Sequence, residues 1–193
     1  MLKRLLGIAL VFSVSPALAG GLSYNFVELG YQNAELDGDF GGISVDGDGY
    51  GISGSFEVGD SWFVTASYGT LDFDFGVDLD QLSIGGGFYM DLSDRADFYA
   101  AISYIQAEIS APGLGSADED GYGVTVGLRG MVTDKVELNG GISYSDLGDG
   151  ADGTAFGAGA LYSFTDTFAL GVNLETDDDV TVYGIGARFY FGN

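Results

Sequence analysis

Hydrophobic and polar residues alternate one by one along most of the chain beyond residue 24, and glycine is spread throughout. A period of two is typical of β-strands with one apolar face, and frequent glycine opposes long helices. No stretch beyond residue 24 is apolar for the ~20 residues that a membrane-spanning helix requires. The alternation predicts ten strands, at residues 24–35, 48–58, 62–71, 79–90, 97–108, 121–132, 136–145, 154–164, 168–175 and 180–191.

The predicted connections are short at one end of the strands and mostly longer and acidic at the other. The short ones are residues 59–61, 91–96, 133–135 and 165–167, and the others are 36–47, 72–78, 109–120, 146–153 and 176–179. This alternation is what an antiparallel up-and-down meander requires, and similar segments that each follow a short turn support repeated hairpins. The pattern predicts an all-β, antiparallel up-and-down barrel of ten strands, with eight strands as the alternative.

The two faces of the predicted strands differ in a way that separates membrane barrels from soluble ones. One face carries large apolar residues, such as Val27, Leu29 and Ile52, whereas the other carries Gly, Ser, Gln and sparse charges. The second face has too little apolar volume for a hydrophobic core. A transmembrane barrel places its apolar face toward lipid and its polar face inward. We therefore expect a wet lumen lined by small residues, and the alternative is a secreted two-sheet β-sandwich.

Aromatic residues gather on the apolar face at both ends of the strands. Two belts of amphipathic rings that flank an aliphatic band are typical of the two interfaces of a bilayer. The belt near the longer connections is predicted to contain Tyr31, Tyr50, Tyr68, Tyr104, Tyr122, Tyr144 and Tyr183. The belt near the short turns is predicted to contain Trp62, Phe98, Phe168, Phe189 and Phe191.

The first residues have the pattern of an export signal. Lys3 and Arg4 precede a short apolar stretch, and Ala17 and Ala19 form an A-x-A cleavage site. This pattern predicts a cleavable signal peptide at residues 1–19 and a barrel domain at 20–193. An N-terminal membrane anchor is the alternative, but the apolar stretch is shorter than a bilayer span.

Composition excludes several kinds of function. The 193 residues include 6 Lys and Arg, 29 Asp and Glu, and no His or Cys, for a formal net charge of −23. So acidic a chain lacks the basic surface that nucleic-acid binding needs. The absence of Cys and His removes thiolate and Ser-His catalysis and the common transition-metal ligands. Because 46% of the residues are hydrophobic, the chain does not have the composition of a disordered acidic tail.

Most of the acids lie in or beside the longer connections and predict an acidic mouth. Its members are Asp37, Asp39, Asp46, Asp48, Asp72, Asp74, Asp118, Glu119, Asp120, Asp177, Asp178 and Asp179. Carboxylates suit hard cations such as Ca²⁺, and residues 46–51 begin like a calcium loop. Tyr50 breaks that pattern, however, so we favour a solvated, mutually repelling surface with diffuse cation contacts. No cofactor and no specific metal site is assigned.

Five charged residues have the parity of the polar face and lie near the short-turn ends of their strands: Glu28, Glu57, Arg129, Glu137 and Arg188. Closure of the barrel pairs the first and last strands and brings Arg188 near Glu28. The hairpin at residues 133–135 brings Arg129 near Glu137. We predict one lumenal ion network from these residues. It serves either to balance charge inside the barrel or to act as a pore gate or selectivity filter.

Taken together, the signal peptide, the Ser-Asp and Thr-Asp turns at 93–94, 133–134 and 165–166, and the aromatic-ended last strand resemble a known group. The chain is similar to the small outer-membrane β-barrels of Gram-negative bacteria, the OmpA/OmpX-like, porin-like group. The resemblance implies an outer-membrane location, contact with lipid and lipopolysaccharide, insertion by the barrel-assembly machinery and a monomeric state. The residues Gly192 and Asn193, which follow the usual terminal aromatic, depart from the pattern.

Two functions of different class fit these observations. Barrel enzymes of this kind, as the resemblance implies, use an essential His, which this chain lacks, so we expect no catalytic residue. The first hypothesis is a porin-like barrel whose narrow polar lumen passes small solutes or cations. The alternative is a non-conducting structural or surface-interaction barrel that contributes to envelope integrity or adhesion.

Overall fold

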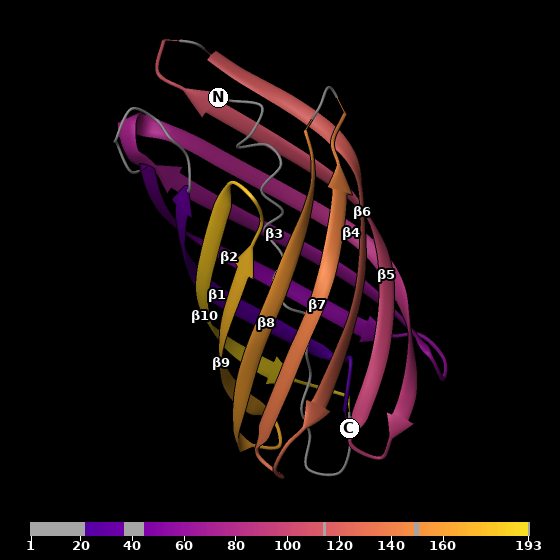
Figure 1. Ribbon diagram of the computed structural model, residues 1–193. Helices are drawn as coiled ribbons and strands as arrows, with labels where there is room; N and C mark the ends of the chain where they lie inside the picture. The colour runs from indigo at the N-terminus through magenta and orange to yellow at the C-terminus, as the bar shows by residue number, and fades with distance from the viewer. Residues whose placement is uncertain (1–21, 37–44, 114, 149–150, 193) are drawn as a thin grey trace.

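The computed structural model describes residues 22–36, 45–113, 115–148 and 151–192 and shows a closed antiparallel barrel (Figure 1). Each strand pairs with its neighbours in sequence, and β1 pairs with β10 to close the ring. The prediction of ten strands is confirmed, and the eight-strand alternative is wrong. The strands are β1 (Phe26–Leu36), β2 (Val45–Glu57), β3 (Trp62–Phe73), β4 (Val77–Ser93), β5 (Ala96–Ala111), β6 (Gly115–Met131), β7 (Val136–Asp146), β8 (Asp152–Thr165), β9 (Phe168–Thr176) and β10 (Val180–Tyr190).

Helical structure is nearly absent from this part of the chain. A short 3₁₀ turn, η1 (Asp74–Gly76), joins β3 to β4. Across the described ranges, no helix has the length and hydropathy needed to cross a membrane.

Several strands extend well beyond their predicted ends. The strands β4, β5 and β6 have 17, 16 and 17 residues, and the connection predicted at 109–120 shrinks to residues 112–114. The alternation continues through Gln106-Ala107-Glu108-Ile109, but with its phase reversed: the apolar residues here are buried and the polar ones exposed. The sequence interpretation ended this strand at residue 108 and placed residues 109–120 in a connection. The structure continues β5 to Ala111, and the reversal marks the height at which the surroundings of the barrel change.

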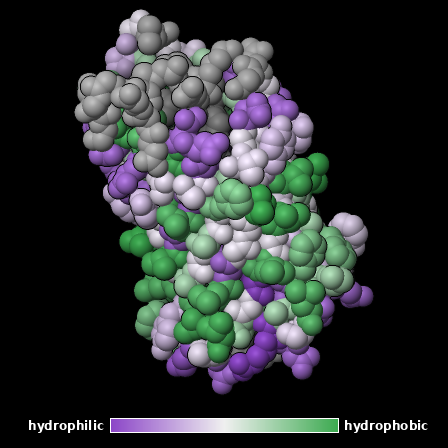
Figure 2. Space-filling model, viewed as in Figure 1, coloured by the Kyte–Doolittle hydropathy of each residue, from purple (hydrophilic) through white to green (hydrophobic). Residues whose placement is uncertain are grey.

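Aromatic side chains lie on the outer surface at both ends of the strands. Tyr31 and Tyr50 face outward as cross-strand partners with ring centroids 5.2 Å apart, and Tyr122 and Tyr144 lie 6.5 Å apart. At the short-turn end, Trp62 is 60% exposed. Figure 2 shows hydrophobic side chains gathered over the short-turn half of the barrel, with hydrophilic residues at its rim and over much of the opposite half.

Beyond the tyrosine belt, the outward positions become acidic. We call this outward set the acidic collar. It comprises Glu35, Asp46, Asp48, Asp72, Asp78, Asp80, Glu108, Asp118, Asp120, Asp146 and Asp152. The barrel therefore has an inverted, membrane-type surface over one half and a polar, water-facing surface over the other.

Candidate functional site

The lumen of the barrel holds most of the buried polar side chains and is the candidate site. Its residues come from the inward parity of all ten strands, and they form three sections along the axis. A short-turn section holds the charges and aromatic rings, a middle section holds small polar residues, and an apolar section lies inside the acidic collar.

The first ion pair of the short-turn section lies at the seam where the barrel closes. Glu28 and Arg188 are direct cross-strand partners of β1 and β10, and Arg188 Nε donates to Glu28 Oε2 at 2.6 Å. The guanidinium also lies 4.1 Å from the centre of the Phe26 ring. Arg188 is only 1% exposed, so the carboxylate and the ring take the place of the water that would otherwise solvate its charge.

The second ion pair has a partner that the sequence analysis missed. Arg129 Nε donates to Asp97 Oδ2 at 3.2 Å, because the two are cross-strand partners of β5 and β6. The expected partner, Glu137, is buried but lies opposite Met131 in the β6–β7 register. Within the described residues, the network prediction thus meets two ion pairs, Arg188–Glu28 and Arg129–Asp97, and whether Glu137 joins them stays a prediction. The inward parity that Asp97 shares with Tyr99 was the signal that could have identified it.

Residues 22–25, which precede β1, add an aromatic plug to this section. The ring of Tyr24 stacks between Phe63 and Tyr89, with centroid distances of 4.7 and 4.3 Å, and lies 4.0 Å from Cζ of Arg129. Tyr24 was predicted to lie in the first strand, but β1 begins at Phe26. Burial raises the pKa of the Tyr24 hydroxyl, so the ring stays neutral beside the guanidinium.

Glu57 holds this plug in place through hydrogen bonds. Its two carboxylate oxygens accept hydrogen bonds from the backbone N–H of Tyr24 and from Nδ2 of Asn25, both at 2.9 Å. The backbone N–H of Glu57 in turn donates to Asn25 Oδ1 at 2.9 Å. Three hydrogen bonds thus join the end of β2 to the segment that enters the lumen.

Glycines make room for the large rings of the short-turn section. A side chain added at Gly127 would lie 2.5 Å from Cζ of Tyr99, and one added at Gly87 would lie 2.4 Å from Cζ of Phe63. Contacts this short are not tolerated, so each ring lies over a strand that carries no side chain. These two glycines therefore permit close packing of the rings.

The middle section matches the expected small polar lining. Ser53, Ser55, Gln32 and Gln81 are buried there. A cavity of about 20 Å³ beside Tyr99 is also lined by Asn139, Ser143 and Glu175. A space of this size is enough for roughly one water molecule.

The apolar section contradicts the expectation of a lumen that is polar throughout. Leu71, Phe73 and Leu79 are at most 5% exposed and pack with buried side chains from β1, β2, β5, β10 and the β7–β8 connection. The other members of this cluster are Ala34, Leu36, Val45, Ile105, Ala107, Ile109, Leu147, Ala151, Val180 and Val182. Because the collar outside them faces water, the apolar side chains at this height turn inward, as in a soluble barrel.

The residues of the predicted acidic mouth have several different positions. Asp46, Asp48, Asp72, Asp118 and Asp120 lie on the outer face of strands, and Glu119 shares the inward parity of its partner Ala107. Asp74 lies in η1, and Asp177 shapes the β9–β10 turn by accepting the backbone N–H groups of Asp179 and Val180 at 2.8 and 2.7 Å. Asp178 is exposed in the same turn, while Asp37, Asp39, Ala17 and Ala19 lie outside the described residues.

Like charges face one another directly in this collar. In the strand register, Asp72 lies opposite Asp48 on one side and Asp78 on the other, and Glu108 lies opposite Asp118. Among the described residues, no group of three or more such side chains has an arrangement that could hold a metal ion. The collar therefore presents a field of negative charge and no coordination site.

Comparison with known proteins agrees with this architecture. A search of curated protein sequences finds no significant match. An outer membrane channel from Pseudomonas putida F1 superposes with a TM-score of 0.55 and 10% sequence identity, over 95% of this chain and 100% of that one. The translocator domain of autotransporter NalP from Neisseria meningitidis gives a TM-score of 0.53 and 14% identity, over 88% of this chain and 89% of that one.

At these identities the two structures share only the fold with this chain. The family comparison is more specific: a model of the outer membrane protein beta-barrel domain matches residues 5–164, most of the chain. The chain, which folds as a closed ten-stranded barrel with an apolar outer band, therefore belongs to the outer membrane protein β-barrel domain family.

Proposed function

We propose that the protein is a non-enzymatic, structural barrel of the outer membrane whose lumen is closed to ions at rest. The observation that carries this proposal is the apolar section, in which buried side chains from β1 to β5, from β10 and from the β7–β8 connection pack against one another. A hydrophobic constriction excludes water, and with it hydrated ions. The short turns face the periplasm in the usual orientation of such barrels, so the apolar section and the collar lie on the extracellular side.

The periplasmic end supports the same proposal. Tyr24, Phe63 and Tyr89 stack across the lumen, and the two buried arginines are held by carboxylates of neighbouring strands. Charges fixed in pairs do not offer a mobile ion a free binding site, and the stacked rings reduce the open cross-section. A polar middle section flanked in this way resembles a packed interior more than a channel.

A porin-like passage for small solutes or cations is the second candidate. The polar middle section favours it, and the acidic collar would raise the local concentration of cations at the extracellular mouth. This function requires the apolar section to open. In either case we expect export through cleavage after residue 19, insertion by the barrel-assembly machinery, contact with lipopolysaccharide, and a monomer.

Single-channel recording in planar bilayers tests the proposal. We expect no steady conductance from the refolded wild-type barrel, and a measurable conductance from the double variant Leu71→Ser/Leu79→Ser, which makes the apolar section polar. The matched control, Leu71→Val/Leu79→Val, shortens the same side chains but keeps them apolar and is expected to stay closed. Heat-modifiable gel migration confirms that each variant has folded. Steady cation-selective conductance of the wild type would overturn the proposal and favour the porin-like passage.

A further inference from the structure

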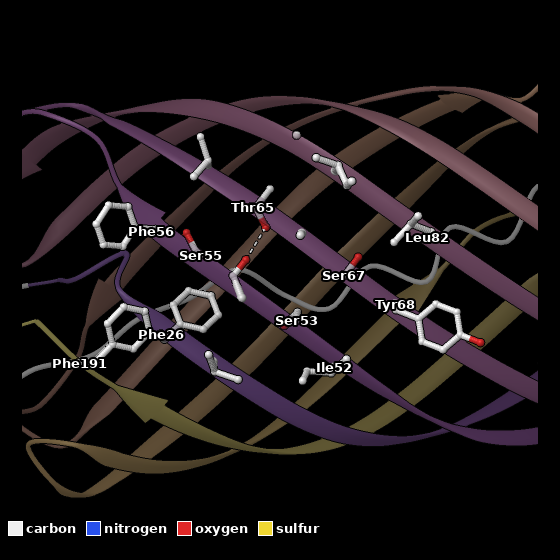
Figure 3. A pocket seen from close by; sticks show the side chains of 16 residues that line it. Phe26, Ile52, Ser53, Ser55, Phe56, Thr65, Ser67, Tyr68, Leu82 and Phe191 are labelled. Atoms are coloured by element: carbon white, nitrogen blue, oxygen red, sulfur yellow. Dashed lines mark hydrogen bonds between the residues drawn. The ribbon is translucent and has the colours of Figure 1, made fainter.

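A groove runs along the lipid-facing surface of β2, β3 and β4 and has a volume of about 600 Å³ (Figure 3). Its walls include Ile52, Leu82 and Ile84, all of which are outward residues of the apolar band. Its floor lies where two outward side chains are small, at Gly54 and Ala66, which are direct cross-strand partners. The groove is thus a local thinning of the barrel wall within the bilayer.

The glycine in this floor is not required by the backbone. A Cβ added at Gly54 would meet the carbonyl oxygen of Phe26 at 3.5 Å and Cγ2 of Val27 at 3.9 Å, which are ordinary contacts. The backbone φ angle of Gly54 is also not positive, so its conformation is open to other residues. The lumenal Gly87 differs, because its missing side chain accommodates Phe63. Glycine at position 54 therefore keeps the groove deep and serves no evident packing need.

The groove has defined ends. At the periplasmic end, the rings of Phe56 and Phe191 stack with centroids 6.5 Å apart and an interplanar angle of 16°. At the other end lies Tyr68, whose hydroxyl donates to Asp80 Oδ1 at 2.7 Å. The four residue steps from Ile52 to Phe56 span roughly 13 Å at ~3.3 Å per residue. Figure 3 shows Ile52, Leu82 and Tyr68 at one end and the two phenylalanines at the other.

The surroundings of the groove indicate its occupant. It lies between the two aromatic belts and is continuous with the lipid-facing surface, where hydrocarbon chains are the bulk medium. The charged residue at the extracellular end is Asp80, and the turn that follows Phe56 carries the exposed Asp60. The cations Arg95 and Lys135 lie in the β4–β5 and β6–β7 turns and do not line the groove. An anionic headgroup is therefore disfavoured at both ends, whereas an ammonium group would be attracted to Asp60.

We propose that this groove binds one acyl chain of a zwitterionic phospholipid from the periplasmic leaflet, with the ammonium headgroup facing Asp60. Phosphatidylethanolamine has this chemistry. The bound chain would fill the groove and complete the thickness of the barrel wall at β2–β4. The inference is independent of whether the lumen conducts.

The single tryptophan of the chain supplies the measurement. Trp62 is exposed on the same face of β3, two residues from Val64 in the groove wall. The barrel is refolded into phosphatidylcholine vesicles that contain a rising fraction of phosphatidylethanolamine with brominated chains, which quench tryptophan. At low fractions of the brominated lipid, we expect the quenching of Trp62 fluorescence to be at least three times the value for random contact with bulk lipid. The double variant Gly54→Leu/Ala66→Leu should reduce this excess to the bulk value.

A matched control uses Ala158→Leu, which adds the same side chain to an exposed outward position of β8, far around the ring. This variant should quench like the wild type. Native mass spectrometry should find one retained phosphatidylethanolamine on the wild type and the control, and none on the groove variant. Heat-modifiable migration establishes that the groove variant is folded.

Four results would overturn the proposal: no excess quenching of the wild type, excess quenching that persists in the folded groove variant, stronger quenching by brominated phosphatidylglycerol, or preferential retention of lipopolysaccharide. A crosslinked dimer of the wild type that the groove variant loses would also overturn it, since the occupant would then be a second copy of the chain.

Discussion

Arg188 shows at the scale of one residue how the barrel tolerates a charge inside it. The guanidinium is 1% exposed and is held by Glu28 and by the ring of Phe26. Taking a charge out of water costs several kcal/mol, and an opposite charge at hydrogen-bonding distance offsets much of that cost. The pair also joins β1 to β10, so it contributes to closing the ring.

Glu28→Gln removes the carboxylate charge but keeps the shape of the side chain. We expect it to lower the free energy of unfolding by about 3 kcal/mol, because the buried guanidinium loses its counter-charge. The double variant Glu28→Leu/Arg188→Leu removes both charges and should recover most of that loss. Urea unfolding of the barrel in phospholipid vesicles measures both effects. A loss below about 0.5 kcal/mol in the single variant would show that the pair contributes little.

The extended hairpins show at the scale of elements that strands continue beyond the membrane at an electrostatic cost. Asp72 lies directly between Asp48 and Asp78 in the strand register. Like charges directly opposite one another destabilise a sheet by a few tenths of a kcal/mol to about 1 kcal/mol. The inward cluster of the apolar section stabilises the same strands from the other face.

Asp72→Asn should therefore raise the free energy of unfolding by about 0.5 kcal/mol at low ionic strength. The gain should shrink toward zero in about 1 M salt, where the Debye length is only about 3 Å. Asp134→Asn serves as the control, since Asp134 pairs with Arg95 and its loss should give no gain. A gain at position 72 that is the same at all salt concentrations would show that charge repulsion is not its cause.

The whole molecule changes character along its axis. Over the short-turn half, apolar side chains face outward and polar ones inward, and within the collar the order is reversed. The change follows the tyrosine belt, where we expect the membrane to end. Eleven of the 29 acidic residues thus lie in the collar, on the water-facing outer wall of an extended barrel.

Paired arginine substitutions test where the membrane ends. Val172→Arg places a charge in the outward apolar band of β9, where Val172 is 58% exposed, and should cost about 2–4 kcal/mol of unfolding free energy. Thr70→Arg places the same charge on the outer face of β3 opposite Asp80 and should be neutral or stabilising. Vesicle unfolding compares the two. Equal costs at both positions would contradict the proposed boundary.

Much of this architecture was predictable because alternation is a local property. Successive side chains of a strand point to opposite faces, so the run around Ile52 identified a strand and its lipid-facing side without knowledge of its neighbours. The meander of short and longer connections then predicted ten strands. The closeness of Glu28 and Arg188 followed from closure alone, since the first and last strands must pair.

Other features depended on register and height, which the sequence pattern does not contain. The β5–β6 register places Arg129 directly opposite Asp97, and a register shifted by two residues would have placed a different residue opposite Arg129. Tyr24 enters the lumen because Glu57 holds the segment before β1.

The sequence by itself determined that this chain forms a barrel of ten strands with an apolar band and two aromatic belts. The reason is that the alternation of side chains along a strand, and the polarity of each side chain, are local properties of the sequence. Only the tertiary structure decided which face is wet at each height. Burial depends on what surrounds a strand, and the same inward parity is polar behind lipid and apolar behind water. For that reason the apolar section of the lumen, the ion-pair partners and the lipid-facing groove became visible only once the ring had closed.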